Sequence, residues 1–86
     1  MKYDKAVMNR LKRIEGQLRG VIQMMEQEKS CEDIVTQLSA TRSGIDRSIG
    51  LIVSSNLEQC LHKQIEQGES TDDVVKEAVN LLVRSR

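Results

Sequence analysis

The sequence predicts an all-α protein, with three helices of unequal length in one domain, residues 1–86, that needs further copies of itself to be stable. Proline is absent, which favours long uninterrupted helices. Apolar residues recur at helical spacing, and no strand pattern, repeat or low-complexity tract interrupts them. A chain of 86 residues with a single aromatic residue builds only a thin aliphatic core. Oligomerisation is therefore the expected way to bury more surface.

The first helix is expected to begin after Asp4, whose side chain can cap it. Its apolar residues alternate in steps of four and three, which is the seam of a packed helix. The members of this seam are Val7, Leu11, Ile14, Leu18, Val21 and Met25. Gly16 and Gly20 lie one turn apart, so another backbone could approach that face closely. A short break is expected at residues 26–29.

Residues 30–33, Ser-Cys-Glu-Asp, fit a capping box that begins a long second helix. Its seam consists of Val35, Leu38, Ile45, Ile49 and Ile52. Small residues surround its centre and would let a second copy pack closely: Ser39, Ala40, Ser43, Gly44, Ser48 and Gly50. Gly68 is the natural stop. Residues 70–73, Ser-Thr-Asp-Asp, are expected to cap a short third helix.

Cys31 and Cys60 lie 29 positions apart in the second helix. At 100° per residue this is about 20° past eight turns, so both thiols point to nearly the same side. Along the axis they are about 44 Å apart, whereas a disulfide needs Cα atoms within roughly 7 Å. They can meet if two copies pack antiparallel about a twofold axis near Ile45 and Asp46, so that each Cys31 faces the Cys60 of the other copy. Two unrelated buried thiols are the alternative.

The chemistry of the two thiols is the next question. Cys31 falls in the first turn of the second helix, where free amides and the helix dipole favour the thiolate. It is therefore expected to react first, and Cys60 of the neighbouring chain could then form a crosslink. No histidine base or oxyanion arrangement surrounds Cys31, so an enzyme is not predicted. His62 projects about 200° away from Cys60 and is expected at the surface. Asn56 shares the face of Cys60, but a carboxamide is a weak ligand for soft metals.

The formal net charge of zero conceals a basic first helix. Residues 1–20 hold six basic and two acidic residues, a local charge of +4. This suggests an anionic partner for that face, and the near absence of aromatic residues favours a DNA duplex over a single strand. An ordinary solvated helix surface is the alternative. Because no apolar run could span a membrane and no signal peptide is evident, a soluble cytoplasmic protein is expected.

Residues 10–20, RLKRIEGQLRG, resemble the first-helix signature of the copper-sensitive operon repressor (CsoR/RcnR) family. The resemblance covers nearly the whole chain, including both cysteines. Members of this family are small all-α bacterial repressors that form antiparallel helical-bundle dimers and flat dimer-of-dimers tetramers. They bind operator DNA without inducer and release it when an inducer binds between protomers. The resemblance thus implies a homodimer or homotetramer on double-stranded operator DNA.

Within this family, the resemblance is closest to the CsoR-like sulfurtransferase repressors (CstR). The copper sensors carry a histidine one turn before the second cysteine, where this chain has Asn56. The N-terminal histidine of the nickel and cobalt sensors and the proline of the formaldehyde sensors are also missing. The CstR branch implies persulfide or polysulfide inducers, which link Cys31 to Cys60 of the partner protomer through di-, tri- or polysulfide bridges. It implies no cofactor and no resident metal.

The DNA contacts are inferred in two ways. The family resemblance implies operator contacts at Arg10 and Arg47. The candidates from charge alone are Lys12, Arg13 and Arg19, with Arg42 as a further one. For Arg42 and Arg47, packing or ion pairing between subunits is the alternative.

The sequence therefore predicts a transcriptional repressor that senses reactive sulfur through Cys31 and Cys60. One alternative is a Cu(I)-sensing repressor that uses only the two thiolates. Another is a sulfur-carrier accessory protein, whose persulfidated Cys31 passes sulfur to an enzyme. A third is a structural helical oligomer with inert cysteines. The basic first helix argues against the last two, because neither of them needs it.

Overall fold

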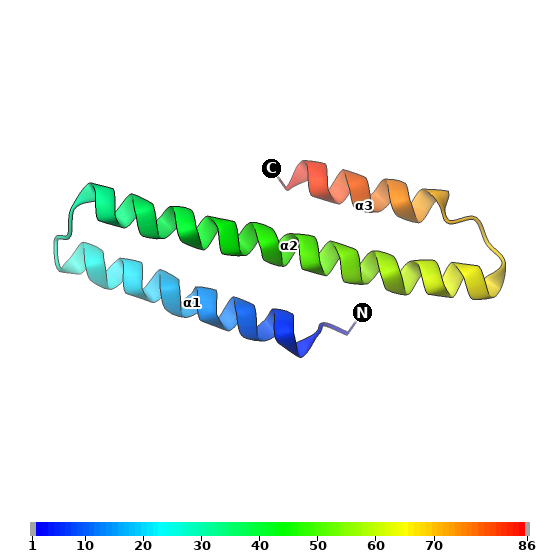
Figure 1. Cartoon of the computed structure of the whole chain (residues 1–86), viewed down its shortest axis with the longest axis horizontal. Helices are drawn as coiled ribbons and strands as arrows, with labels where there is room; N and C mark the ends of the chain where they lie inside the picture. Colours follow the sequence, from blue (N-terminus) through cyan, green and yellow to red (C-terminus); the bar gives the residue numbers. More distant parts are fainter. Residues whose placement is uncertain (1, 86) are drawn as a thin grey trace. The chain divides into compact units, whose positions relative to one another are not determined.

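The computed structural model describes residues 2–85 and contains only helices and their connections over that range (Figure 1). Helix α1 is Lys5–Glu26, α2 is Cys31–Gln67 and α3 is Asp72–Arg84. The all-α class and the three unequal helices, of 22, 37 and 13 residues, are confirmed. The described residues form two compact units, 2–48 and 49–85, and α2 contributes to both. The predicted single domain also includes Met1 and Arg86, which lie outside the described residues.

In the first unit, α1 runs antiparallel to the first half of α2 (Figure 1). The N-terminus of α1 is capped as predicted, since Asp4 Oδ1 accepts a hydrogen bond from the amide of Ala6 at 2.9 Å. Helix α1 buries Val7, Ile14 and Val21, which are spaced seven residues apart. These three are every second member of the predicted seam, so one stripe of α1 supplies its part of the core.

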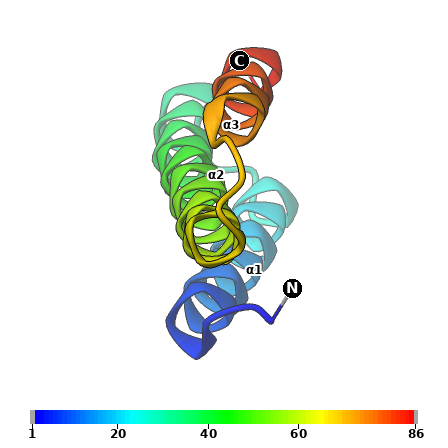
Figure 2. The ribbon, with the colours of Figure 1, turned by 90° about the vertical axis from the view of Figure 1, so that its right-hand side faces the viewer.

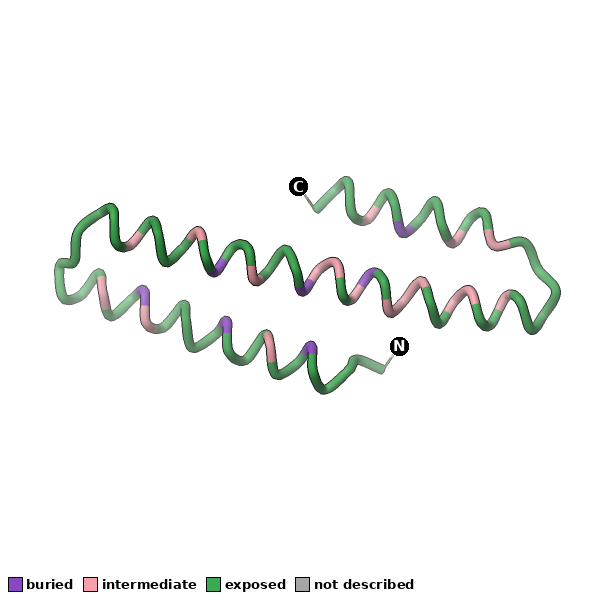
Figure 3. Tube along the Cα trace, in the orientation of Figure 1, coloured by how far each residue is buried: buried purple, intermediate pink, exposed green. Residues whose placement is uncertain are grey.

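The remaining seam positions of the first unit are exposed. On α1 these are Leu11, Leu18 and Met25, and on α2 they are Val35, Leu38 and Ile45. Figure 3 shows how few positions of the trace are buried. A chain with this much exposed apolar side chain is a poor stand-alone monomer, which agrees with the expected need for further copies.

Within the first unit, the buried residues of α2 are small and polar. Thr41 and Ser48 are 3% and 2% exposed, and their hydroxyls donate to the carbonyls of Gln37 and Gly44. A Cβ atom added at Gly44 would lie 3.3 Å from Cδ1 of Ile14. Gly44 was expected to let a second copy pack closely, but in the structure α1 of the same chain packs closely against it.

Within the described chain, no other segment lies close to Gly16 or Gly20. A Cβ atom at either position would meet nothing within 4 Å. Helix α1 turns the stripe of Val7, Ile14 and Val21 toward the core, so a close approach at the two glycines stays a prediction for packing between copies.

In the second unit, the second half of α2 and α3 lie side by side, joined by a short connection (Figures 1 and 2). Helix α2 ends at Gln67, and Gly68 adopts φ +70 as its predicted stop. Within the segment 70–73 that was expected to cap α3, Ser70 Oγ accepts a hydrogen bond from the amide of Asp72 at 3.4 Å, while Thr71 makes no side-chain cap. Within residues 2–85, no helix is both long enough and apolar enough to cross a membrane.

Candidate functional site

Cys31 is the first residue of α2 and carries an exposed, free thiol. The helix start is fixed by Ser30, whose Oγ accepts a hydrogen bond from the amide of Asp33 at 3.1 Å. This is the predicted N-terminal cap. The thiol is therefore held at a defined position on a rigid helix and is open to a small electrophile or a soft metal ion.

Cys60 is a free, half-buried thiol in the second unit. It donates a weak hydrogen bond to Oδ1 of Asn56, one turn earlier, with an Sγ–Oδ1 distance of 3.9 Å. The expectation that Asn56 shares the face of Cys60 is confirmed. The two cysteines thus differ: Cys31 is open to solvent, while Cys60 is partly covered and has a polar neighbour.

The donors within one chain are too few for a closed metal site. Over residues 2–85, no three His, Cys, Asp or Glu side chains gather closely enough to hold an ion. His62 is exposed, as predicted, and its Nε2 lies 4.0 Å from Oε1 of Glu58. The pairing of Cys31 with the Cys60 of a second copy stays a prediction.

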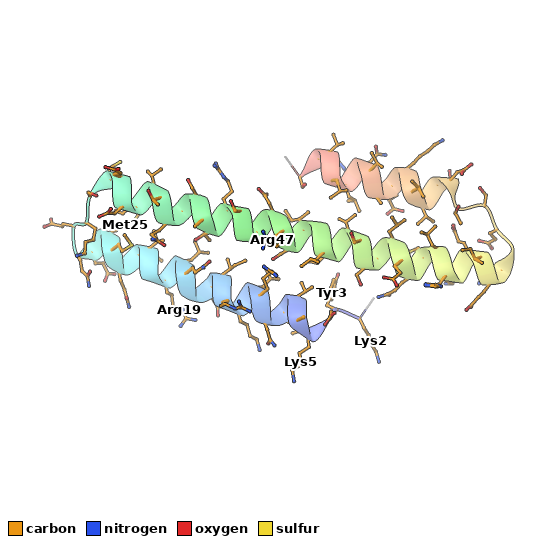
Figure 4. The ribbon with its side chains drawn as sticks, viewed as in Figure 1. Lys2, Tyr3, Lys5, Arg19, Met25 and Arg47 are labelled. Atoms are coloured by element: carbon orange, nitrogen blue, oxygen red, sulfur yellow. The ribbon has the colours of Figure 1, made fainter. Side chains whose placement is uncertain are left out.

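Three of the predicted DNA contacts lie exposed on α1: Lys12, Arg13 and Arg19. Arg19 forms an ion pair with Glu15 at 3.1 Å, in which both side chains are about 70% exposed. An exposed pair of this kind contributes little to stability, so a phosphate could displace Glu15. Lys5 and Arg19 point away from α2 in Figure 4. Arg10 is half-buried. The outer side of α1 therefore presents exposed basic side chains, of which Arg19 is paired with Glu15.

The two arginines of α2 occupy different faces, which the sequence analysis missed. Both are exposed, but they are five residues apart, which is about 140° around the helix. Arg42 continues the four-and-three spacing of Val35, Leu38 and Ile45, the exposed apolar residues of α2. Arg47 lies off that stripe. The heptad spacing could have revealed this difference, because it places position 42 inside the seam.

Comparison with known proteins gives consistent results. Residues 3–84 match the family described as "Metal-sensitive transcriptional repressor". A stretch of 63 residues, 73% of this chain, is 60% identical to the uncharacterized protein YrkD of Bacillus subtilis and covers all of it. The copper-sensing transcriptional repressor RicR of Mycobacterium tuberculosis is 38% identical over 77 residues, 87% of this chain and 79% of RicR. The structure of the copper-sensing repressor CsoR with Cu(I) from Geobacillus thermodenitrificans has 31% identity and a TM-score of 0.79, covering 98% of this chain and 91% of that one.

Proposed function

Because the chain belongs to the metal-sensitive transcriptional repressor family, we propose that it is a cytoplasmic operator-binding repressor rather than an enzyme. The observation that carries this proposal is the family match over residues 3–84, which includes the basic α1 and both cysteines. The working form is a homodimer or homotetramer. The exposed seam residues of α1 and α2 support this, because they need a cover that one chain does not supply.

The DNA surface that we propose is centred on the outer side of α1. Its members are Arg10, Lys12, Arg13 and Arg19, together with Arg47 of α2. Exposed basic side chains on a rigid helix suit the phosphates of a duplex, and each contact adds affinity that falls as salt rises. Arg42 is not part of this surface, because it lies in the apolar seam of α2.

Cu(I) is the first candidate for the inducer. RicR and the Geobacillus CsoR are both described as copper-sensing. They support Cu(I) as the inducer over the persulfide that was predicted from the sequence. Thiolates are soft ligands that select Cu(I). In this proposal, Cys31 of one copy and Cys60 of another bind the ion between them.

A persulfide is the second candidate, and Asn56 is the specific observation in its favour. The side chain that accepts the hydrogen bond of Cys60 is a carboxamide. The proposed pair of Cys31 and Cys60 sulfurs therefore has no imidazole from position 56 as a third metal ligand. The Cys31 thiolate would attack the outer sulfur of a persulfide RSSH, giving a Cys31 persulfide and RS⁻. The Cys60 thiolate of the second copy would then attack the Cys31 sulfur, forming a disulfide and releasing HS⁻.

Either inducer would lower the affinity for operator DNA through the same coupling between the inducer site and the DNA surface. It would bind or bridge two copies and favour an arrangement that holds DNA poorly. A coupling free energy of about 2–3 kcal/mol would weaken operator binding roughly 30- to 150-fold.

An anaerobic titration separates the candidates. A fluorescent operator duplex, obtained by in vitro selection, is bound to the protein, and Cu(I) or a low-molecular-weight persulfide is added. Anisotropy reports release, and intact mass under non-reducing conditions reports the thiols. Release by Cu(I) with unchanged protein mass would establish a copper sensor, whereas release by persulfide with covalent dimers would establish a sulfur sensor.

The matched control in this titration is the Cys31→Ala variant, which should stay bound to DNA after addition of either Cu(I) or persulfide. Sulfur transfer with turnover and no duplex binding would make the repressor proposal wrong and favour a sulfur carrier.

A further inference from the structure

A second copy of the chain needs to cover one particular face of α2. We call it the Arg42 face, and it consists of Val35, Leu38, Arg42 and Ile45, all within the unit of residues 2–48. Its three apolar side chains are 54%, 38% and 38% exposed. Arg42 follows the buried Thr41 by one residue, so it projects about 100° around the helix from the side that α1 covers. The first unit leaves this face partly exposed.

Cys31 belongs to the same side of α2 as Arg42. Eleven residues separate them, which is about 20° past three turns. If Cys31 faces a second copy, as the proposed function requires, then Arg42 must face that copy as well. A guanidinium enclosed among apolar side chains is strongly unfavourable without a carboxylate partner.

Asp46 is the carboxylate in position to supply that partner. It is the only acidic residue between Asp33 and Glu58, and it stands beside the twofold axis expected from the cysteine spacing. With the axis between residues 45 and 46, Arg42 and the Asp46 of the second copy are separated by about 4.5 Å along the helix direction. Packed helices lie about 8–10 Å apart, a gap that an arginine side chain spans. Over residues 2–85, neither residue takes part in an ion pair within the chain.

We infer that Arg42 of each copy pairs with Asp46 of the second copy across the twofold axis. The two symmetric pairs disfavour a one-turn shift of the antiparallel α2 helices in the direction that moves both pairs apart, because the charges would then lie about 9.9 Å from each other along the helix direction, enclosed and unpaired. This inference rests on the proposed function, since the register in which it is argued is the one that brings Cys31 to the Cys60 of the second copy. It assigns Arg42 to the interface between copies rather than to DNA.

Two charge-reversed variants, Arg42→Asp and Asp46→Arg, test the pairing. Each variant alone would place like charges across the axis. A mixture of the two restores both pairs between unlike copies, but it restores no pair within a single helix. The test therefore separates pairing between copies from an i,i+4 pair inside α2. The variants are unfolded together, refolded as a mixture, and analysed by native mass spectrometry, because the two homodimers and the mixed dimer differ in mass.

The expected result is a mixed dimer in at least about tenfold excess over each homodimer, since like charges across an interface are strongly disfavoured. If the single variants do not fold alone, recovery of helical circular dichroism on mixing supports the inference, and a failure to recover overturns it. A statistical distribution of the three dimers would also overturn it. The matched control is Arg47→Asp mixed with Asp46→Arg, which should show no preference, because Arg47 lies off the Arg42 face.

Crosslinking of the unmodified protein keeps the two proposals distinguishable. It is treated with diamide, and Cys31–Cys60 linkage between copies is read from the intact mass of the covalent dimer and its peptides. Linkage together with a statistical variant mixture removes the ion pair and leaves the proposed function intact. A dominant mixed dimer without any such linkage keeps the ion pair and removes the proposed inducer site.

Discussion

The thiol of Cys60 lies 3.9 Å from Oδ1 of Asn56, one turn earlier on α2. A side chain at position 56 is therefore next to the sulfur that the proposed inducer must reach. A carboxamide there can accept a hydrogen bond from the thiol but offers little to a soft metal. The identity of this one residue should thus bear directly on which inducer the protein prefers.

Replacing Asn56 with histidine should tighten Cu(I) binding by at least about tenfold, because imidazole is a good copper ligand and would join two thiolates. Chelator competition under anaerobic conditions measures the affinity. Asn56→Leu is the control of similar size without a donor atom, and it should not tighten binding. Equal Cu(I) affinity in N56H and the unmodified protein would show that position 56 does not reach the bound ion.

Replacing Lys12 with alanine should weaken operator binding and reduce the slope of log K against log salt by about one, the signature of one lost phosphate contact. Anisotropy titrations at several salt concentrations provide both quantities. Lys63→Ala removes an exposed lysine of α2 outside the proposed DNA surface and should leave the slope unchanged. An unchanged slope for K12A would remove Lys12 from the surface.

Replacing Glu28 with glycine should stabilise the protein by about 0.5–1 kcal/mol, because Glu28 adopts φ 58, where a side chain is strained. The amides of Glu28 and Lys29 bond the carbonyls of Met25 and Met24, which closes α1 in a Schellman motif. Urea unfolding at a fixed protein concentration measures the change.

The matched control for this change lies at the end of α2. Gly68 and Glu69 make the same pair of bonds to Ile65 and Gln64, and Gly68 has φ 70. Gly68→Ala should therefore lose about as much stability as Glu28→Gly gains. A loss of stability in E28G would contradict the strain argument.

Replacing Gln64 with methionine should raise the free energy of unfolding by about 1 kcal/mol, because a buried acceptor without a partner carries a desolvation cost. Gln64 Oε1 is such an atom among the described residues. Urea unfolding again provides the measurement, and Gln59→Met at an exposed position should change stability by less than about 0.5 kcal/mol. A less stable Q64M would mean that this oxygen finds a partner when copies assemble.

The local structure could be predicted well from sequence because it depends on neighbouring residues. Asp4, Ser30 and Gly68 act at helix ends within a few positions of themselves, so their roles follow from short-range rules. The connection after α1 contains Glu28 in the left-handed backbone region, and no short-range rule predicts a glutamate there. Ser70, within the segment expected to cap α3, accepts the amide hydrogen bond of Asp72.

The sequence does not predict which apolar residues are buried within one chain and which stay exposed. The seam of α1 shows which residues are apolar, but not that Val7, Ile14 and Val21 face their own chain while Leu11 and Leu18 stay exposed. The packing of Ile14 against Gly44 could not be predicted either, because a small residue allows any segment to pack closely. These choices depend on contacts between distant segments, which spacing within one helix does not encode.

The most direct test of the central claim is whether the two thiols of one inducer site come from different copies. Cys31→Ser and Cys60→Ser variants are unfolded together, refolded as a mixture, and treated with diamide, and their masses are measured without reductant. The account predicts a covalent dimer with one copy of each variant, joined through the remaining Cys31 and Cys60, and almost no covalent dimer in either variant alone. Equal crosslinking in each variant alone, or none in the mixture, would contradict a site shared between copies.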